Sequence, residues 1–277
     1  MRSKILVAGA DSSFCRSFFQ AVEARGVCVE KIPIKTHSSG EMELGAFSGG
    51  AKDLVLQLPF LSPNKTFLCA QLLNKKFPVL PFCIPFVPYA RNLESFSALY
   101  SDFRKIQTFD FHMSKTSFPF LRDEDLSDFF AKALQGFSFD EKTTFVLGPD
   151  KGSLRRATRL GQVLQLPVFI AEKKRMEREC LVSLPDIPPS FRTCIVRDDI
   201  LDSGETLEAA ITSLKRMGIF RIIAVVTHVL SSDWDPSLQG IDLVTLDIFE
   251  GPSQSSLFKI PFADFLLSRI LDLPRGF

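Results

Sequence analysis

The residues best suited to chemistry lie at positions 194–206, where the sequence reads C-I-V-R-D-D-I-L-D-S-G-E-T. An apolar run, two adjacent carboxylates and a Ser-Gly-x-Thr turn before an amphipathic segment predict a strand, a loop and a helix N-terminus. Backbone N–H groups of residues 203–206, with the two hydroxyls of this turn, can bind a phosphate at the positive end of the helix dipole. Asp198 and Asp199 can accept hydrogen bonds from ribose hydroxyls, directly or through hydrated Mg²⁺. The stretch therefore predicts a site for a phosphorylated sugar.

The same turn has a simpler interpretation as a helix cap. Asp202 or Ser203 is a good N-cap residue, and an Asp-Asp pair before a turn is common on protein surfaces. For a Ser-Gly-x-Thr turn alone, the cap is the better interpretation. The apolar strand before the turn and the paired acids favour the sugar-phosphate site.

Apolar strands alternate with helices along the whole chain. Strands are predicted at residues 4–10, 27–33, 53–58, 79–86, 106–111, 143–147, 168–171, 220–227 and 242–249, and helices at 12–25, 63–76, 123–134, 154–164, 203–217 and 262–271. This alternation implies an α/β fold with mostly parallel sheets covered on both faces. We expect two domains of similar plan, residues 1–139 and 140–261, with the final helix at about 262–277 packing back on the first. In such sheets ligands bind beyond the carboxyl ends of the strands, where the polar clusters of this sequence fall.

Composition describes a globular protein without a strong charge. The chain has 277 residues, 45% of them hydrophobic and 23% charged, and a formal net charge of +1. This balance argues against nucleic acid as a partner. The N-terminal apolar run is too short for a signal peptide and no later run approaches a membrane span, so a cytoplasmic protein without a membrane partner is expected. The six cysteines form no C-x-x-C pair and are expected to be small buried hydrophobes in a reducing compartment.

Six further motifs follow one another along the chain. They are H-S-S-G-E at 37–41, I-P-F-V-P-Y-A-R-N at 84–92, T-F-D-F-H at 108–112, G-P-D-K-G at 148–152, E-K-K-R at 172–175 and A-V-V-T-H at 224–228. With the stretch at 194–206, which is similar to the PRPP-binding signature (PRPP is 5-phosphoribosyl 1-diphosphate), they make the chain resemble a divergent member of the PRPP synthetase, or ribose-phosphate diphosphokinase, family. The resemblance implies two phosphoribosyltransferase-like domains, each a mostly parallel sheet flanked by helices.

The resemblance also implies a role for each motif. The implied metal is Mg²⁺, held near His112 and Asp150. The implied catalytic residues are Lys173, Arg175 and His112. ATP would be bound by Glu41, Ser39, Arg91 and Asn92, with the 37–41 turn reaching it from a neighbouring subunit. The ribose 5-phosphate site would comprise Asp198, Asp199, Asp202, Ser203, Gly204, Glu205 and Thr206. A homo-oligomer is implied as well, assembled from dimers, for which the resemblance allows a hexamer.

The implied reaction is attack of the ribose 5-phosphate 1-hydroxyl on the β-phosphorus of ATP, which gives PRPP and AMP for nucleotide biosynthesis. A second hypothesis is a catalytically weak or inactive homologue with a regulatory or structural role. It is motivated by His37 and Ser39, which stand where the family has an aromatic residue and an aspartate, and by a 91–112 segment shorter than the family's. Glu205 also replaces a glycine of the family's phosphate loop. The third hypothesis is a phosphoribosyltransferase that uses PRPP, against which stand the ATP-type motifs of the N-terminal half.

Overall fold

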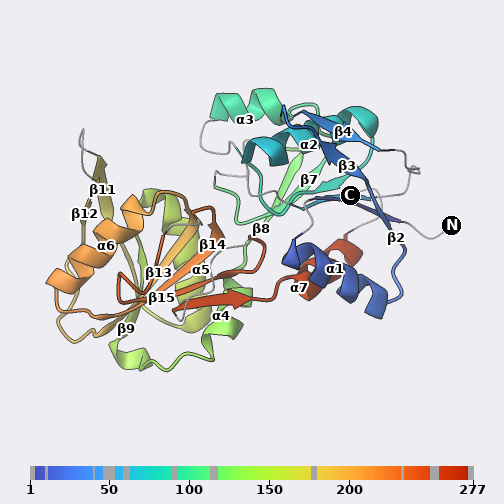
Figure 1. Cartoon of the computed structure of the whole chain (residues 1–277). Coiled ribbons are helices and arrows are strands. Elements are labelled where there is room, and N and C mark those ends of the chain that lie inside the picture. The colour runs from blue at the N-terminus through green and yellow to red at the C-terminus, as the bar shows by residue number, and fades with distance from the viewer. Residues whose placement is uncertain are drawn as a thin grey trace. The chain divides into compact units, whose positions relative to one another are not determined.

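The computed structural model describes residues 4–9, 12–39, 41–45, 54–58, 63–88, 93–112, 118–175, 180–231, 234–249 and 256–273. The chain forms two compact units (Figure 1). The first unit comprises Met1–Glu124, Ile248–Glu250 and Pro261–Phe277, and the second comprises Asp125–Asp247 and Gly251–Ile260. The sequence predicts the division at residue 139, but it lies at residue 124, because α4 (Ser127–Leu134) packs on α5 (Leu154–Leu164) of the second unit.

A parallel sheet forms the centre of the first unit. Its strands lie in the order β2-β1-β5-β6-β7-β8, and every neighbouring pair is parallel. The strands are β1 (Ile5–Ala8), β2 (Val29–Lys31), β5 (Leu54–Gln57), β6 (Phe82–Cys83), β7 (Ile106–Phe109) and β8 (Leu121–Glu124), and the helices are α1 (Ser13–Ala24), α2 (Pro63–Lys76), α3 (Leu93–Tyr100) and α7 (Ala263–Leu271). All residues of β1, β6 and β7 are buried, as expected of strands covered on both faces.

Aromatic side chains fill much of the first unit's core. The chain contains 28 phenylalanines. Phe96 of α3 lies at the centre of one cluster, with its ring centroid 4.5 Å from that of Phe118, 4.7 Å from that of Tyr100 and 4.9 Å from that of Phe111. Packing within this unit thus accounts for part of the chain's phenylalanine content.

Helix α7, near the end of the chain, lies in the first unit and packs on α1. Phe262, which precedes it, places its ring centroid 5.2 Å from that of Phe109 at the end of β7. Arg269 of α7 pairs with Glu124 of β8 at 2.6 Å. The chain therefore returns to its first unit after the second is complete.

The second unit repeats the plan of the first. Its strands lie in the order β10-β9-β13-β14-β15-β16, all parallel to their neighbours. They are β9 (Thr144–Gly148), β10 (Val168–Ile170), β13 (Thr193–Leu201), β14 (Arg221–Val229), β15 (Asp242–Leu246) and β16 (Leu257–Ile260), with the helices α4, α5 and α6 (Glu205–Arg216) and the short 3-10 turns η2 (Glu141–Thr143) and η3 (Lys151–Ser153). Helix α6 buries Leu207, Ala210, Ile211 and Leu214. These apolar residues recur at the three- and four-residue spacing from which the sequence predicts a helix.

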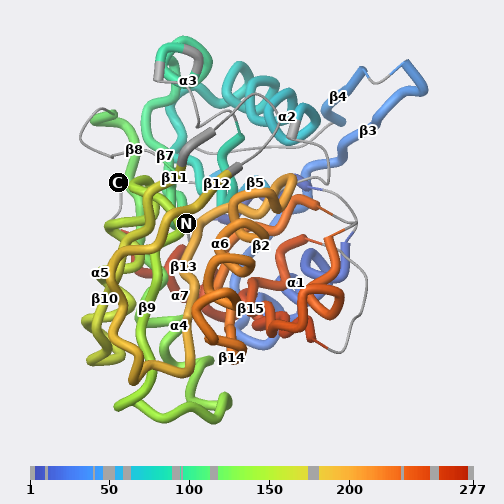
Figure 2. Tube along the Cα trace, turned by 90° about the vertical axis from the view of Figure 1, so that its left-hand side faces the viewer, coloured from blue at the N-terminus to red at the C-terminus, as the bar shows by residue number. Residues whose placement is uncertain are grey.

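The sequence does not predict two antiparallel hairpins. One pairs β3 (Ile34–Thr36) with β4 (Met42–Leu44), and it projects from the first unit near α2, as the blue trace in Figure 2 shows. The other pairs β11 (Glu172–Arg175) with β12 (Cys180–Ser183) and extends from the second unit beside α6 (Figure 1). Both hairpins carry motifs named above.

The two parallel sheets flanked by helices confirm the predicted α/β fold. Some elements differ from the prediction: residues 121–124 form strand β8, so the helix expected at 123–134 begins only at Ser127. Helix α3 and strand β16 are also absent from the prediction. Within the described ranges, no helix combines the length and the apolar character that crossing a membrane needs.

Candidate active site

The loop after β13 has the strand, turn and helix order that the sequence predicts. Asp202 and Ser203 are exposed, Gly204 is buried, and α6 begins at Glu205. The N-cap of α6 is Gly204 rather than Asp202 or Ser203, with a left-handed φ of 86°. A glycine contributes no side chain to cap the helix, so the helix-cap interpretation does not explain this turn. The first amides of α6 lie at the carboxyl end of β13, where a phosphate can bind.

Asp198 and Asp199 lie in the last part of β13, and their side chains point to opposite faces of the sheet, because neighbours in a strand alternate. Asp199 is 2% exposed and its carboxylate lies 3.1 Å from the guanidinium of Arg156 on α5. Asp198 is partly exposed and lies on the same face as Val196, which packs with the buried residues of α6. Its carboxylate accepts a hydrogen bond from the Asp199 N–H at 2.9 Å. Of the two acids, only Asp198 therefore lies on the face of the sheet that α6 covers.

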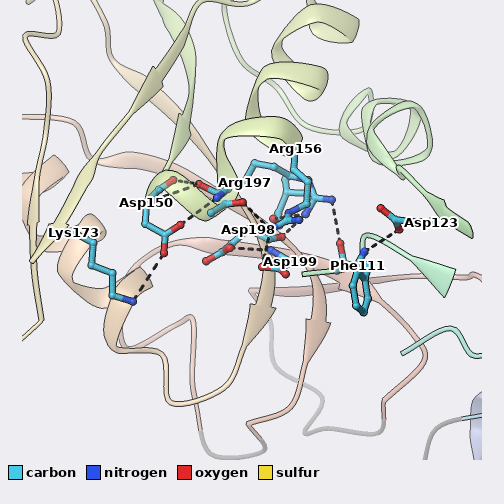
Figure 3. A network of polar contacts seen from close by, with 12 residues as sticks. Phe111, Asp123, Asp150, Arg156, Lys173, Arg197, Asp198 and Asp199 are labelled. Carbon is cyan, nitrogen blue, oxygen red and sulfur yellow. Dashed lines mark hydrogen bonds and ion pairs between the residues drawn. The ribbon is translucent and has the colours of Figure 1, made fainter. Parts of the chain in front are cut away.

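Three carboxylates share this end of the sheet (Figure 3). Burial, followed by the neighbouring carboxylates of Asp199 and Asp150, raises the pKa of Asp198 well above its usual range, although Arg156 acts in the opposite direction. Asp199 pairs with Arg156, and Asp150 lies 4.0 Å from the Lys173 ammonium, so the three carboxylates outnumber these two cations. An excess of negative charge favours the approach of a further cation.

Asp150 follows β9 and is held by its own turn. One of its carboxylate oxygens, Oδ1, accepts a hydrogen bond from the Ser153 N–H at 3.1 Å and caps the short turn η3. The other, Oδ2, lies 4.0 Å from the ammonium of Lys173. A Cβ added to Gly148 would lie 2.6 Å from the Ser153 hydroxyl, so a glycine is needed where the strand enters this turn.

Lys173 connects three of the predicted motifs. It lies on β11, its side chain is 17% exposed, and besides approaching Asp150 it donates a hydrogen bond to the Thr206 hydroxyl in the first turn of α6 (Figure 3 shows the approach to Asp150). The structure thus brings Asp150, Lys173, Asp198 and Thr206 to the carboxyl ends of β9, β10 and β13. Arg175 lies on β11 too, but its side chain is outside the described residues.

The residues predicted to bind nucleotide belong to the first unit. Ser39 and Glu41 are exposed at the tip of the β3–β4 hairpin, where the Ser39 hydroxyl donates a hydrogen bond to the Glu41 carboxylate at 3.2 Å. Arg91 and Asn92 lie outside the described residues. His112 is half-buried just after β7, and the preceding Phe111 N–H donates to the buried carboxylate of Asp123 at 2.9 Å.

The donor chemistry near the 203–206 loop fits a magnesium ion. Within the described ranges, His, Cys, Asp and Glu side chains do not gather in threes as metal cages. Mg²⁺ is usually held by one or two carboxylates together with waters and substrate phosphates. Asp150 and Asp198 supply two such carboxylates, which lie close enough for Asp150 to raise the pKa of Asp198.

The sequence interpretation missed two buried arginines of the second unit. Arg156 is 2% exposed and also donates a hydrogen bond to the Gly152 carbonyl at 3.1 Å. Arg197 is 0% exposed: it donates to the Thr227 hydroxyl at 3.1 Å and lies over the Phe130 ring at 4.8 Å. A lone arginine inside the apolar run of β13 was the available signal, because a buried charge requires partners.

Comparison with known proteins agrees with this geometry. The phosphoribosyl transferase domain family matches residues 124–256. The ribose-phosphate pyrophosphokinases of Pyrococcus abyssi and Pyrococcus furiosus are 26% and 25% identical to this chain, over 71% and 72% of it and 75% and 78% of their own lengths. The crystal structure of phosphoribosylpyrophosphate synthetase from Mycobacterium smegmatis shares the fold over 98% of both chains, with a TM-score of 0.76 at 20% identity. With two parallel sheets of one plan and the D-S-G-E-T turn at 202–206, this chain is similar to the PRPP synthetases in sequence and in fold.

Proposed function

We propose that this chain transfers the diphosphoryl group of ATP to the 1-hydroxyl of ribose 5-phosphate, giving PRPP and AMP. The observation that carries the proposal is the position of Lys173, whose ammonium lies between the Asp150 carboxylate and the Thr206 hydroxyl. A cation at the edge of a phosphate loop suits a reaction in which negative charge is shared between two phosphorylated substrates. The names of the relatives, ribose-phosphate pyrophosphokinase, support the same chemistry.

The second unit would hold the ribose 5-phosphate. Its 5-phosphate would accept hydrogen bonds from the amides of residues 203–206 and from the hydroxyls of Ser203 and Thr206, at the positive end of α6. Asp198, on the same face of β13, would accept a hydrogen bond from a ribose hydroxyl. Asp199 would act from the opposite face of the sheet. There its ion pair with Arg156 holds in place the strand that carries Asp198.

In the reaction, a bond forms between the ribose O1 and the β-phosphorus of ATP, and the bond from that phosphorus to the oxygen shared with the α-phosphate breaks. AMP leaves with this oxygen, and the hydroxyl proton is released. Such a transfer depends on alignment and on neutralising charge. Lys173, with Arg175 of the same strand, would stabilise the charge of the transferring group. In the second unit, Asp150 and Asp198 would hold Mg²⁺, which would neutralise phosphate oxygens when bound.

The ATP site would be formed by Ser39, Glu41, Arg91 and Asn92. The exposed tip of the β3–β4 hairpin projects from its unit, which suits a residue pair that serves the ATP site of a neighbouring copy. The active form would then be a homo-oligomer. Size measurement in solution by light scattering tests this point, and a monomer with full activity contradicts it.

The direct test of the proposal is to incubate the purified chain with ribose 5-phosphate and Mg-ATP and to measure AMP and PRPP. AMP formation that requires ribose 5-phosphate supports the proposal. If ATP binds but neither product forms, the chain is a non-catalytic homologue with a regulatory or structural role. If instead PRPP is consumed when a nucleobase is supplied, the chain is a phosphoribosyltransferase.

Replacing Asp198 with asparagine is expected to raise stability and lower affinity for ribose 5-phosphate. The pKa of Asp198 is raised on folding, so the folded state binds the carboxyl proton more tightly than the unfolded state does. The bound proton therefore stabilises the fold at low pH, and this stabilisation is lost as the pH rises through the folded pKa. Asparagine cannot ionise and still accepts the Asp199 N–H. The variant should therefore be more stable than the wild type at neutral pH, and this gain should shrink toward pH 4.

Urea unfolding of the two proteins at several pH values measures this difference. The exposed Asp186 provides a control, and D186N should follow the wild-type pH profile. A D198N protein that is less stable than wild type at pH 7 contradicts the charge assignment.

A further inference from the structure

The only tryptophan of the chain, Trp234, lies against the phosphate loop. It follows β14 and is 8% exposed. A Cβ added to Gly204 would lie 2.3 Å from Cδ1 and 2.4 Å from Nε1 of the indole, so the five-membered part of the ring sits directly on the Gly204 backbone. The left-handed φ of 86° at this residue turns the chain from β13 into α6 over the ring.

The indole is fixed at a second point on the same helix. Its Nε1 donates a hydrogen bond to the Glu208 carboxylate at 2.8 Å, a charge-assisted contact. The Glu208 N–H in turn donates to the Gly204 carbonyl at 2.9 Å, which closes the first turn of α6. Trp234 therefore contacts both ends of the turn whose amides face the phosphate position.

Two further sets of contacts hold the indole ring in place. The Trp234 N–H donates to the Ser231 hydroxyl at 3.2 Å, just after β14. The indole also belongs to the buried core of the second unit, with Leu207 and Leu201. The loop after β14 thus supports the loop after β13 from within the unit.

We propose that Trp234 is a positioning residue, which holds the 203–206 loop and the first turn of α6 in the geometry that binds the 5-phosphate. This inference rests on the proposed function, because it takes ribose 5-phosphate as the ligand of the loop. Backbone amides bind a phosphate well only if they already point at it, and the ring leaves Gly204 no room to relax. Trp234 does not touch the nucleotide in this assignment.

Replacing Trp234 with alanine is therefore expected to weaken ribose 5-phosphate binding about tenfold or more, since small displacements of a positioned loop have effects of this size. The KM for ATP should change less than about twofold, a split that general loss of structure would not produce. W234F keeps a ring beside Gly204 and loses only the N–H donor to Glu208. Its affinity for ribose 5-phosphate should therefore lie between those of the wild type and W234A. Isothermal titration calorimetry with ribose 5-phosphate measures all three.

The matched control is Phe191, another aromatic residue of the second unit, which packs 5.3 Å from Phe145 and 5.9 Å from Phe169. F191A removes a ring from the same core without touching the loop, and its affinity for ribose 5-phosphate should equal that of the wild type. Emission from Trp234, as the sole tryptophan, should change on titration with ribose 5-phosphate and saturate where the calorimetric signal does.

A double-mutant cycle tests the contact itself. G204A should cost less affinity and stability in the W234A protein than in the wild type, because the collision with the ring is then absent and only the left-handed backbone conformation is penalised. If wild type binds ribose 5-phosphate and W234A and W234F bind it equally well, the positioning role is refuted while the proposed function stands. If wild type itself shows no binding, the proposed function fails, and this inference with it.

Discussion

Replacing Lys173 with alanine should lower kcat for PRPP formation by about 10²–10³-fold, the usual effect of removing one group that stabilises charge in a transition state. The side chain reaches the Asp150 carboxylate and the Thr206 hydroxyl and is 17% exposed, so it lies at the site rather than in the apolar core. Thermal unfolding should therefore change little. Steady-state assays of AMP release, with each substrate varied in turn, measure the effect.

The kinetic constants distinguish two roles of Lys173. If its ammonium acts on the transferring diphosphoryl group, kcat falls and the KM for ribose 5-phosphate changes little. If it only helps Thr206 to bind the 5-phosphate, that KM rises while kcat is kept. Lys151 is the matched control: it follows Asp150 directly, its side chain is 83% exposed, and it pairs only loosely with Glu172 at 3.7 Å. K151A should stay within about twofold of wild type, since exposed ion pairs contribute little. A K173A enzyme with unchanged constants would mean that β11 carries no catalytic residue.

The fold was largely predictable because its strongest signals are local. Helix α6 buries Leu207, Ala210, Ile211 and Leu214, which the sequence places at helical spacing. Strand β8 shows where this reasoning fails. Its sequence, L-R-D-E, looks helical, yet Asp123 accepts the Phe111 N–H and Glu124 pairs with Arg269. These partners lie elsewhere in the sequence, so the spacing of apolar residues within 121–124 does not reveal the strand.

The site was predictable in its residue types and less so in its geometry. Asp198 and Asp199 are adjacent in the sequence and were expected to act alike on the ribose, but the alternation of a strand sends them to opposite faces. Which one faces α6 depends on the register of β13 against β9 and β14. The contact of Trp234 with Gly204 likewise depends on the order of the strands, because it joins the loops after β14 and β13.

Lys173 is an intermediate case. The E-K-K-R motif identifies it by resemblance, yet its approach to Asp150 requires the β11–β12 hairpin, which the sequence does not predict. The charged residues of β11 resemble a solvated loop, because a hairpin that extends from the sheet has little apolar surface to bury. The motif thus predicts a role for Lys173, whereas the position of its side chain was not predictable from the sequence.

Removing the cation of the buried Arg156–Asp199 pair is expected to cause the largest loss of stability. R156M should cost about 3–5 kcal/mol, because Asp199 would be left as a buried, unpaired charge. The two side chains are 2% and 3% exposed and lie 3.1 Å apart. Unfolding of the second unit in urea, followed by circular dichroism, measures the loss.

The same helix supplies the control. Arg159 lies one turn further along α5 and pairs with Asp128 at 3.0 Å, but these side chains are 48% and 64% exposed. R159M should therefore cost only about 0.2–1 kcal/mol. The double variant R156M/D199N should recover much of the stability lost in R156M, since no buried charge then remains unpaired. Equal losses in R156M and R159M would show that the pair is not buried in solution.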